Sequence, residues 1–230
     1  MNDGLIREGA ALVASMDGHG LTVRLLGGAG VALHCGGAAH RPIADLDALA
    51  PRAQARALAV AIQGEGYRPE ARFNALHGDR RLIFHGPQGK LDVFVGAFEM
   101  CHRLELEGRL ALDSPTLTVS DLLLTKLQIV ELNAKDAQDA ALLLRTHELG
   151  SGPGDHVDVD YLAGLVARDW GLWRTTTGTL RRLAELEPAV AEPAHALVAA
   201  FDAVPKTRAF RMRARIGERV RWYELPDEIG

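Results

Sequence analysis

Three carboxylates fall inside two short apolar segments of this chain, where packing alone gives no reason for a charge. Asp45 and Asp47 flank a single leucine, and Asp92 stands within the apolar run over residues 91–95. Strand residues two apart point to the same face, so Asp45 and Asp47 can share a cation. Because gathered acids repel one another, we expect the third acid, from another strand, to complete a cluster stabilised by Mg²⁺ or Mn²⁺.

A pair of glycines precedes these acids. Gly27 and Gly28 follow an apolar run over residues 21–26 and come before a short helical pattern over residues 29–35. Backbone N–H groups at the start of a helix, unhindered by side chains, can hold a phosphate. A phosphate turn beside a carboxylate-held metal suits phosphoryl or nucleotidyl transfer, in which the metals span the attacking and leaving oxygens.

The same glycines allow a second interpretation, a dinucleotide-binding turn. Residues 28–33 match the G-x-G-x-x pattern and an acid follows at roughly the expected distance, but Leu33 stands where the third glycine belongs. That fold needs only one acid and gives Asp92 no role. A Walker loop is excluded, because no Gly-Lys-Ser/Thr follows the glycines.

The composition is that of an ordinary soluble protein. Its 230 residues, 47% hydrophobic and 24% charged, are enough for one large domain or two small ones. The formal net charge of −4 argues against bulk electrostatic binding to nucleic acid, although a local basic groove stays compatible with it. Two cysteines offer no disulfide framework, and no apolar run has the length of a membrane span or the form of a leader. We therefore expect a cytoplasmic protein.

Hydrophobic periodicity predicts an α+β (α/β) fold, with a small mixed twisted sheet and flanking helices in the first half of the chain. The expected helices cover residues 5–16, 29–35 and 51–63. The expected strands cover residues 21–26, 42–49, 80–85, 90–95, 104–112 and 115–119, with the third and fourth forming a hairpin.

From residue 120 the pattern becomes helical. A helix is expected to start at Ser120, a second helix is expected over residues 135–144, and the remainder to about residue 210 is expected to be mostly helical. We therefore divide the chain into a core over residues 1–118 and a helical C-terminal domain over residues 119–230.

The ordered set of glycines and acids resembles the minimal nucleotidyltransferases of the DNA polymerase β-like superfamily. That superfamily shows a glycine followed by Gly or Ser, then an h-D-h-D/E segment, then a third acid on a neighbouring strand. Matching residues stand here at Gly27, Gly28, Asp45, Asp47 and Asp92.

The likeness is nearest to the bacterial branch that includes the AbiEii-type abortive-infection toxins and related uncharacterised proteins. That branch carries an Arg shortly before the D-x-D, matched by Arg41. It also carries a D-L-x-x-x-K-L segment, matched over residues 121–127, and then K-D-x-x-D, matched over residues 135–139. The match spans about residues 20–145.

The resemblance implies a nucleotidyltransferase core and a role for each matching residue. Asp45 and Asp47 would bind both metals, and Asp92 would bind the catalytic metal. The nucleotide-binding residues would be Gly27 and Gly28 at the β,γ-phosphates, together with Arg41 and Lys126. The implied cofactor is Mg²⁺ or Mn²⁺. The implied reaction transfers NMP from an NTP to an acceptor hydroxyl on tRNA, a protein or a small molecule.

Several alternatives stay open at this point. Lys126 can equally be an ordinary helix lysine with its stem on apolar surface, and Asp136 and Asp139 can hold helix ends and pair with arginines. The basic segment over residues 208–215 fits a solvated surface, or a contact to nucleic acid or triphosphate. The whole chain can also be a non-catalytic nucleotide-binding or partner-binding module, such as one half of a toxin–antitoxin pair with an antitoxin as its partner.

Overall fold

The computed structural model describes residues 3–37 and 41–225. The chain divides into two compact units. The first comprises Met1–Phe98 with Arg103–Thr118, and the second comprises Glu99–His102 with Val119–Gly230. Each unit is described by itself below.

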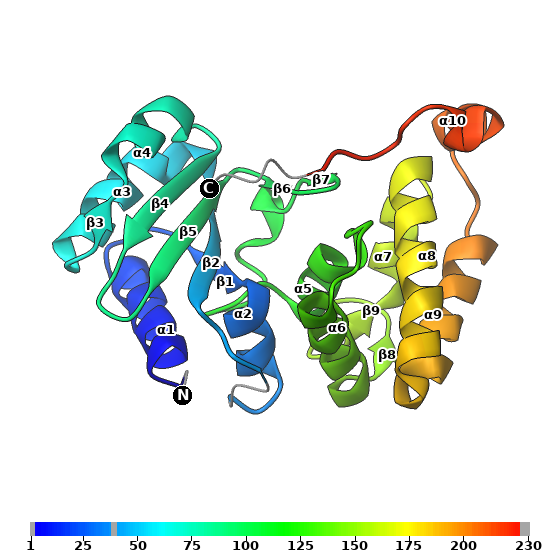
Figure 1. Cartoon of the computed structure of the whole chain (residues 1–230), viewed down its shortest axis with the longest axis horizontal. Helices are drawn as coiled ribbons and strands as arrows, with labels where there is room; N and C mark the ends of the chain where they lie inside the picture. The colour runs from blue at the N-terminus through cyan, green and yellow to red at the C-terminus, as the bar shows by residue number, and fades with distance from the viewer. Residues whose placement is uncertain (1–2, 38–40, 226–230) are drawn as a thin grey trace. The chain divides into compact units, whose positions relative to one another are not determined.

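The first unit is built on a mixed sheet with helices packed against it (Figure 1). Its helices are α1 (Asp3–Gly18), α2 (Gly27–His34), α3 (Ala55–Gly64) and α4 (Ala71–His77). The strands of the sheet are β1 (Arg24–Leu26), β2 (Asp45–Ala50), β3 (Arg68–Pro69), β4 (Arg81–His85) and β5 (Lys90–Val95). Short 3₁₀ turns cover Arg52–Gln54 and Glu107–Arg109.

The sheet has the strand order β1-β2-β5-β4-β3. Strands β2 and β5 run parallel, whereas the other neighbours in the sheet are antiparallel. This mixed sheet with flanking helices confirms the predicted fold class, including the hairpin formed by β4 and β5.

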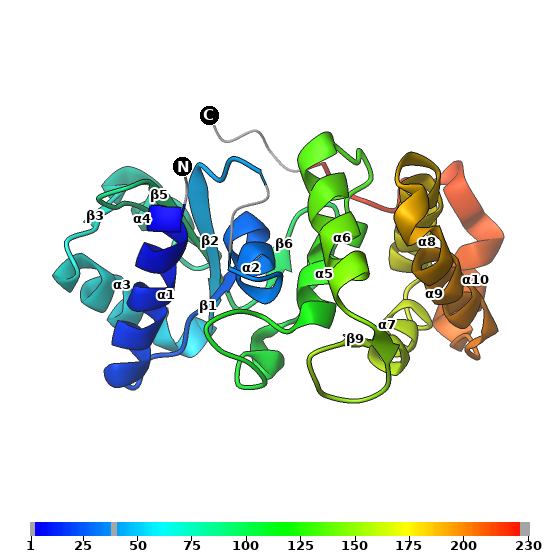
Figure 2. The ribbon, with the colours of Figure 1, turned by 90° about the horizontal axis from the view of Figure 1, so that it is seen from below.

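Alternation along the central strands separates two faces of the sheet. One face supplies Leu46, Ala48, Leu91 and Val93 to the hydrophobic core, where α1 and α3 cover them (Figure 2). The residues between them, including Asp47 and Asp92, therefore point to the opposite face. The packing of the core thus fixes which face the acids occupy.

Two predicted strands are wrong. Residues 104–112 and 115–119 do not extend the sheet. Arg103–Leu104 forms β7, which pairs with β6 (Phe98–Glu99) in a separate two-stranded sheet, and Thr116 makes an isolated bridge to Leu25. The physical reason lies partly in Pro115, which accepts a hydrogen bond from the Leu25 N–H but has no N–H of its own to extend a ladder.

The second unit is predominantly helical, as predicted. Its helices are α5 (Val119–Leu127), α6 (Ala134–Thr146), α7 (Val159–Val166), α8 (Trp170–Leu186), α9 (Ala191–Ala203) and α10 (Arg208–Ile216). It also holds 3₁₀ turns over Pro188–Val190 and Gly217–Arg219, and a two-stranded parallel ladder of β8 (Leu149–Gly150) and β9 (Val157–Asp158).

Side-chain caps explain where several of these helices begin. Asn133 accepts a hydrogen bond from the Asp136 N–H at the start of α6, and Asp158 caps α7 in the same way. Asp169 and Thr207 cap α8 and α10. Each side chain satisfies a backbone donor that has no partner within the helix. Within the described residues, every helix is too short or too polar to traverse a lipid bilayer.

Candidate active site

The structure brings the three predicted carboxylates onto one face of the sheet. Asp47 and Asp92 are direct partners in the parallel β2–β5 ladder, and Asp45 stands opposite Lys90. Side chains of directly opposed strand residues project to the same face and lie close together. Asp92 is only 3% exposed, Asp47 is half-buried and Asp45 is exposed. Exposure to solvent therefore increases from Asp92 through Asp47 to Asp45.

Two cations meet the buried carboxylate. Arg81 Nη2 donates to Asp92 Oδ2 at 2.8 Å, and Lys90 Nζ lies 3.2 Å from the same oxygen. The second oxygen, Asp92 Oδ1, is buried and has no hydrogen-bond partner among the described residues. A buried carboxylate oxygen without a partner is costly unless a cation or donor completes it. Asp92 therefore presents one satisfied and one unsatisfied oxygen.

The glycine pair meets the same face. Gly27 adopts a φ of +62°, and a Cβ added there would lie 2.2 Å from Asp47 Oδ2. A Cβ added at Gly28 would lie 2.6 Å from Arg41 Nη2. Only glycine tolerates both the left-handed backbone at residue 27 and the approach of the Asp47 carboxylate. Four of the predicted site residues thus lie in direct proximity: Gly27, Gly28, Arg41 and Asp47.

The glycines lie within the first turn of a helix. The sequence predicted a helix from residue 29, but α2 already begins at Gly27, with Leu26 as its N-cap and no side-chain capping hydrogen bond. The first N–H groups of a helix lack intrahelical partners and carry the positive end of its dipole. The start of α2 can therefore bind an anion beside Asp47.

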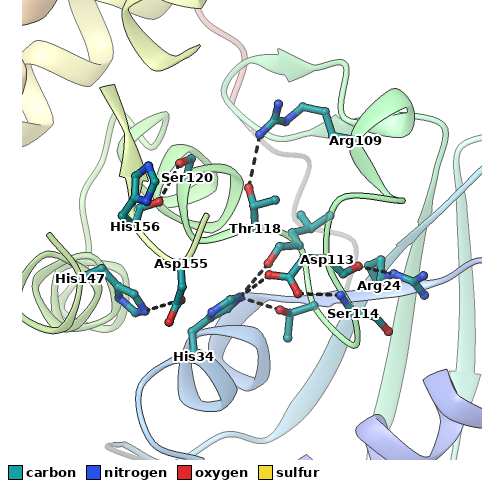
Figure 3. Close-up of polar contacts among 12 residues, drawn as sticks. Arg24, His34, Arg109, Asp113, Ser114, Thr118, Ser120, His147, Asp155 and His156 are labelled. Carbon is teal, nitrogen blue, oxygen red and sulfur yellow. Dashed lines mark hydrogen bonds and ion pairs between the residues drawn. The ribbon is translucent and has the colours of Figure 1, made fainter. Parts of the chain in front are cut away.

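His34 anchors the C-terminal end of α2 through polar contacts. His34 Nε2 lies 2.7 Å from Thr116 Oγ1, 3.0 Å from the Leu117 carbonyl oxygen and 3.4 Å from Asp113 Oδ2 (Figure 3). These contacts hold the helix to the segment that ends the first unit. His34 therefore has a structural role in placing α2, and the sequence pattern gave no indication of it.

Lys126 belongs to the second unit, whereas the other six predicted site residues belong to the first. Its Nζ lies 2.9 Å from Asp136 Oδ1 and 2.9 Å from Asp139 Oδ2, and its side chain is 9% exposed. Burial would lower the pKa of the Lys126 ammonium, but the Asp139 and Asp136 carboxylates outweigh it and raise that pKa above its ordinary value. A lysine thus pairs with both of these acids, for which pairs with arginines were predicted. The contact of Lys126 to a phosphate stays a prediction.

Sequence reasoning missed Arg81 and Lys90. Lys90 stands two residues before Asp92 on β5, and Arg81 lies on the other strand of the predicted hairpin. The alternation that places Asp92 on the site face also places Lys90 there. The signal was therefore present in the strand pattern for Lys90, while Arg81 required the hairpin register.

Comparison with known proteins gives a limited likeness. No family model matches the chain, and no curated protein matches it. The chain aligns with the solution structure of the antibiotic-resistance factor ANT(2'')-Ia, at 14% identity and a TM-score of 0.48, over 94% of this chain and 96% of that one. It also aligns with the crystal structure of an antigenic nucleotidyltransferase-like protein from Paracoccidioides brasiliensis, at 14% identity and a TM-score of 0.46, over 90% and 95% of the two chains. At these values the likeness assigns no role to any residue.

Proposed function

We propose that this chain is a metal-dependent nucleotidyltransferase that moves NMP from an NTP to an acceptor hydroxyl. One observation carries the proposal: Asp47 and Asp92 face each other across β2 and β5, and Gly27 at the start of α2 lies against the Asp47 carboxylate. Carboxylates that can hold a metal and a helix start that can hold a phosphate thus adjoin on one face.

The residues present fit Mg²⁺ or Mn²⁺. Asp92 Oδ1 is a buried oxygen without a hydrogen-bond partner in the part of the chain that the structure describes, and Asp47 and Asp45 follow it along the same face toward solvent. Asp45 and Asp47 would hold both ions, and Asp92 would hold the catalytic one. Bound there, the ions would neutralise charge on the attacking and leaving oxygens of the transfer.

The chain's own residues would bind and orient the nucleotide. The N–H groups at the start of α2 would hold the β- and γ-phosphates, because glycine leaves no side chain in the way. Arg41, whose guanidinium lies against Gly28, would neutralise phosphate charge at the same place. The acceptor oxygen would bond to the α-phosphorus as the bond to pyrophosphate breaks, and the hydroxyl proton would pass to the Asp92 carboxylate.

A binding measurement tests this function without knowledge of the acceptor. We expect Mg²⁺ with at least one of the four NTPs to raise the melting temperature, since a ligand that binds only the folded state stabilises it. The Asp47→Asn variant should lose this shift. Asp79→Asn is the matched control, because Asp79 is an exposed acid 4.0 Å from Arg80. If metal with each NTP gives no shift in the wild type, the proposal fails.

The acceptor and any partner are further parts of the proposal. A tRNA, a protein side chain and a small molecule each offer a hydroxyl, and incubation with labelled NTP separates them by the fraction that takes up label. NTP binding without transfer to any of the three would favour the non-catalytic binding module. Membership of the AbiEii-type branch would add an antitoxin as partner, which copurification with the product of the neighbouring gene would test.

A further inference from the structure

The acidic face carries two cations that the proposed function does not yet use. Arg81 on β4 and Lys90 on β5 both contact Asp92 Oδ2, at 2.8 Å and 3.2 Å. Their side chains are 26% and 38% exposed, whereas the Asp92 side chain is 4% exposed. Both side chains therefore reach solvent in part, while their cationic groups share one oxygen of a buried carboxylate.

In the ion pair of Arg81 with Asp92, each side chain has a polar atom whose hydrogen bond is not made among the described residues. An arginine and a carboxylate that form a permanent structural pair commonly use two parallel hydrogen bonds and both carboxylate oxygens. Here Asp92 Oδ1 and Arg81 Nε are both buried and both lack a hydrogen-bond partner among the described residues. An acceptor and a donor left unsatisfied in the same contact indicate a site that a ligand completes.

The Arg81 guanidinium also stacks on an aromatic ring. It lies 5.1 Å from the centroid of the Phe94 ring, its direct partner in the β4–β5 ladder. Stacking on an aromatic face holds a guanidinium in place without using its N–H donors. Arg81 can therefore change its anionic partner and still remain on this face of the sheet.

We propose that Arg81 and Lys90 are triphosphate-binding residues of this site, held on Asp92 until a metal ion takes that carboxylate. The inference rests on the proposed function and names residues that the sequence pattern did not. Without metal, the two cations neutralise the buried Asp92 charge. When a divalent cation occupies Asp92, its charge repels the guanidinium and the ammonium, and the phosphates of the nucleotide accept their hydrogen bonds instead.

This exchange makes opposite predictions for two ligands. A metal ion alone must compete with Arg81 and Lys90 for Asp92, so removal of either cation strengthens metal binding. A metal-bound triphosphate gains contacts from both cations, so removal of either weakens its binding. Metal and triphosphate therefore bind cooperatively, because each lowers the cost of the other's binding.

The test compares Arg81→Gln and Lys90→Gln with the wild type and with Arg80→Gln as a control. Arg80 precedes Arg81 in the chain, its side chain is 72% exposed, and its ion partner is Asp79. Binding of Mn²⁺ alone is measured by electron paramagnetic resonance of the unbound ion. Binding of Mg²⁺-saturated inorganic tripolyphosphate is measured by calorimetry, and far-UV circular dichroism verifies folding. The more exposed Lys90 gives a second variant in case Arg81→Gln does not fold.

We expect Arg81→Gln and Lys90→Gln to bind Mn²⁺ alone about tenfold more tightly and Mg²⁺-tripolyphosphate about tenfold more weakly, a coupling of ordinary size. Arg80→Gln should match the wild type in both. Weaker or unchanged Mn²⁺ binding by a folded variant overturns the exchange, as does unchanged tripolyphosphate binding. These results leave the proposed function intact if the wild type binds Mn²⁺. A wild type that binds neither ligand overturns the function and this inference together.

Discussion

Gly27 lies so close to Asp47 that a methyl group on its Cα would stand 2.2 Å from the Asp47 Oδ2 atom. Asp47 in turn faces Asp92 across the two parallel strands at the centre of the sheet. Gly27 at the start of α2 therefore lies next to Asp47 on β2, and Asp47 lies next to the buried Asp92 on β5. This arrangement makes Gly27 the residue whose substitution most directly displaces Asp47.

The Gly27→Ala variant should lose both stability and the metal-dependent thermal shift. Its φ of +62° strains an alanine, and the added Cβ must push the Asp47 carboxylate away. We expect a loss of about 2 kcal/mol in the free energy of unfolding, measured by urea denaturation.

Gly36→Ala separates these two effects. Gly36 also has a positive φ, of +94°, but a Cβ there would meet no atom of the described residues within 4 Å. This variant should lose about 1 kcal/mol through backbone strain and keep the metal-dependent shift. A full metal-dependent shift in Gly27→Ala would contradict the contact between the glycine and the site.

Much of this site could be predicted from local patterns. Period-two alternation correctly placed Asp45 and Asp47 on one face, and the apolar runs around residues 86–89 correctly gave the β4–β5 hairpin. The direct pairing of Asp47 with Asp92 could not be predicted, because β2 and β5 are parallel strands joined by a long connection whose register no turn fixes.

The errors have equally local causes. No helix was predicted over residues 71–77, because the short α4 has no buried residue and leaves no apolar stripe in the sequence. The segment around Pro115 is apolar enough for a strand, but it has too few backbone donors to extend the edge at β1. The contact of Arg81 with Asp92 depends on hairpin register and a side-chain rotamer, which composition and spacing do not encode.

The Lys126→Met variant should destabilise the second unit. It would remove the ammonium that lies 2.9 Å from both Asp136 and Asp139, and Asp139 is fully buried. Leaving a buried carboxylate without its cation costs about 3 kcal/mol, which urea denaturation at pH 8 would measure. Lys135→Met is the control, because Lys135 is exposed on α6, the helix that carries both acids. An unchanged free energy of unfolding in a Lys126→Met variant that no longer binds NTP would instead support the phosphate contact.

Lys126 also predicts that the free energy of unfolding decreases at alkaline pH. The folded pKa of Lys126 is raised above its ordinary value of 10.5, so its contribution to stability is full below that value and is lost as the pH rises through the folded pKa. The difference in unfolding free energy between wild type and Lys126→Met should therefore shrink between pH 10 and pH 12, a range chosen around the ordinary lysine pKa. A constant difference across that range would contradict the ion pair.

His102 predicts that the free energy of unfolding decreases at acidic pH. Burial lowers its pKa from 6.5, against the opposing charge of Asp169, and its Nε2 lies 2.8 Å from Thr175 Oγ1. The unfolded chain then takes up the proton more readily, so stability is present above pH 6.5 and falls as the pH drops below it. His102→Asn should flatten this decline in urea denaturation, whereas His77→Asn, at an exposed position, should not. A decline that persists in His102→Asn would contradict this assignment.

The most direct test of the central claim follows the α- and γ-phosphates of the nucleotide separately. The protein is incubated with Mg²⁺, total cellular RNA or protein, and each NTP labelled with ³²P at either the α- or the γ-phosphate. The proposed chemistry predicts that the α-label enters an acceptor, that the γ-label leaves with pyrophosphate, and that Asp47→Asn abolishes the transfer while Asp79→Asn does not. Transfer of the γ-label, or transfer of the α-label that survives Asp47→Asn, would contradict nucleotidyl transfer at this site.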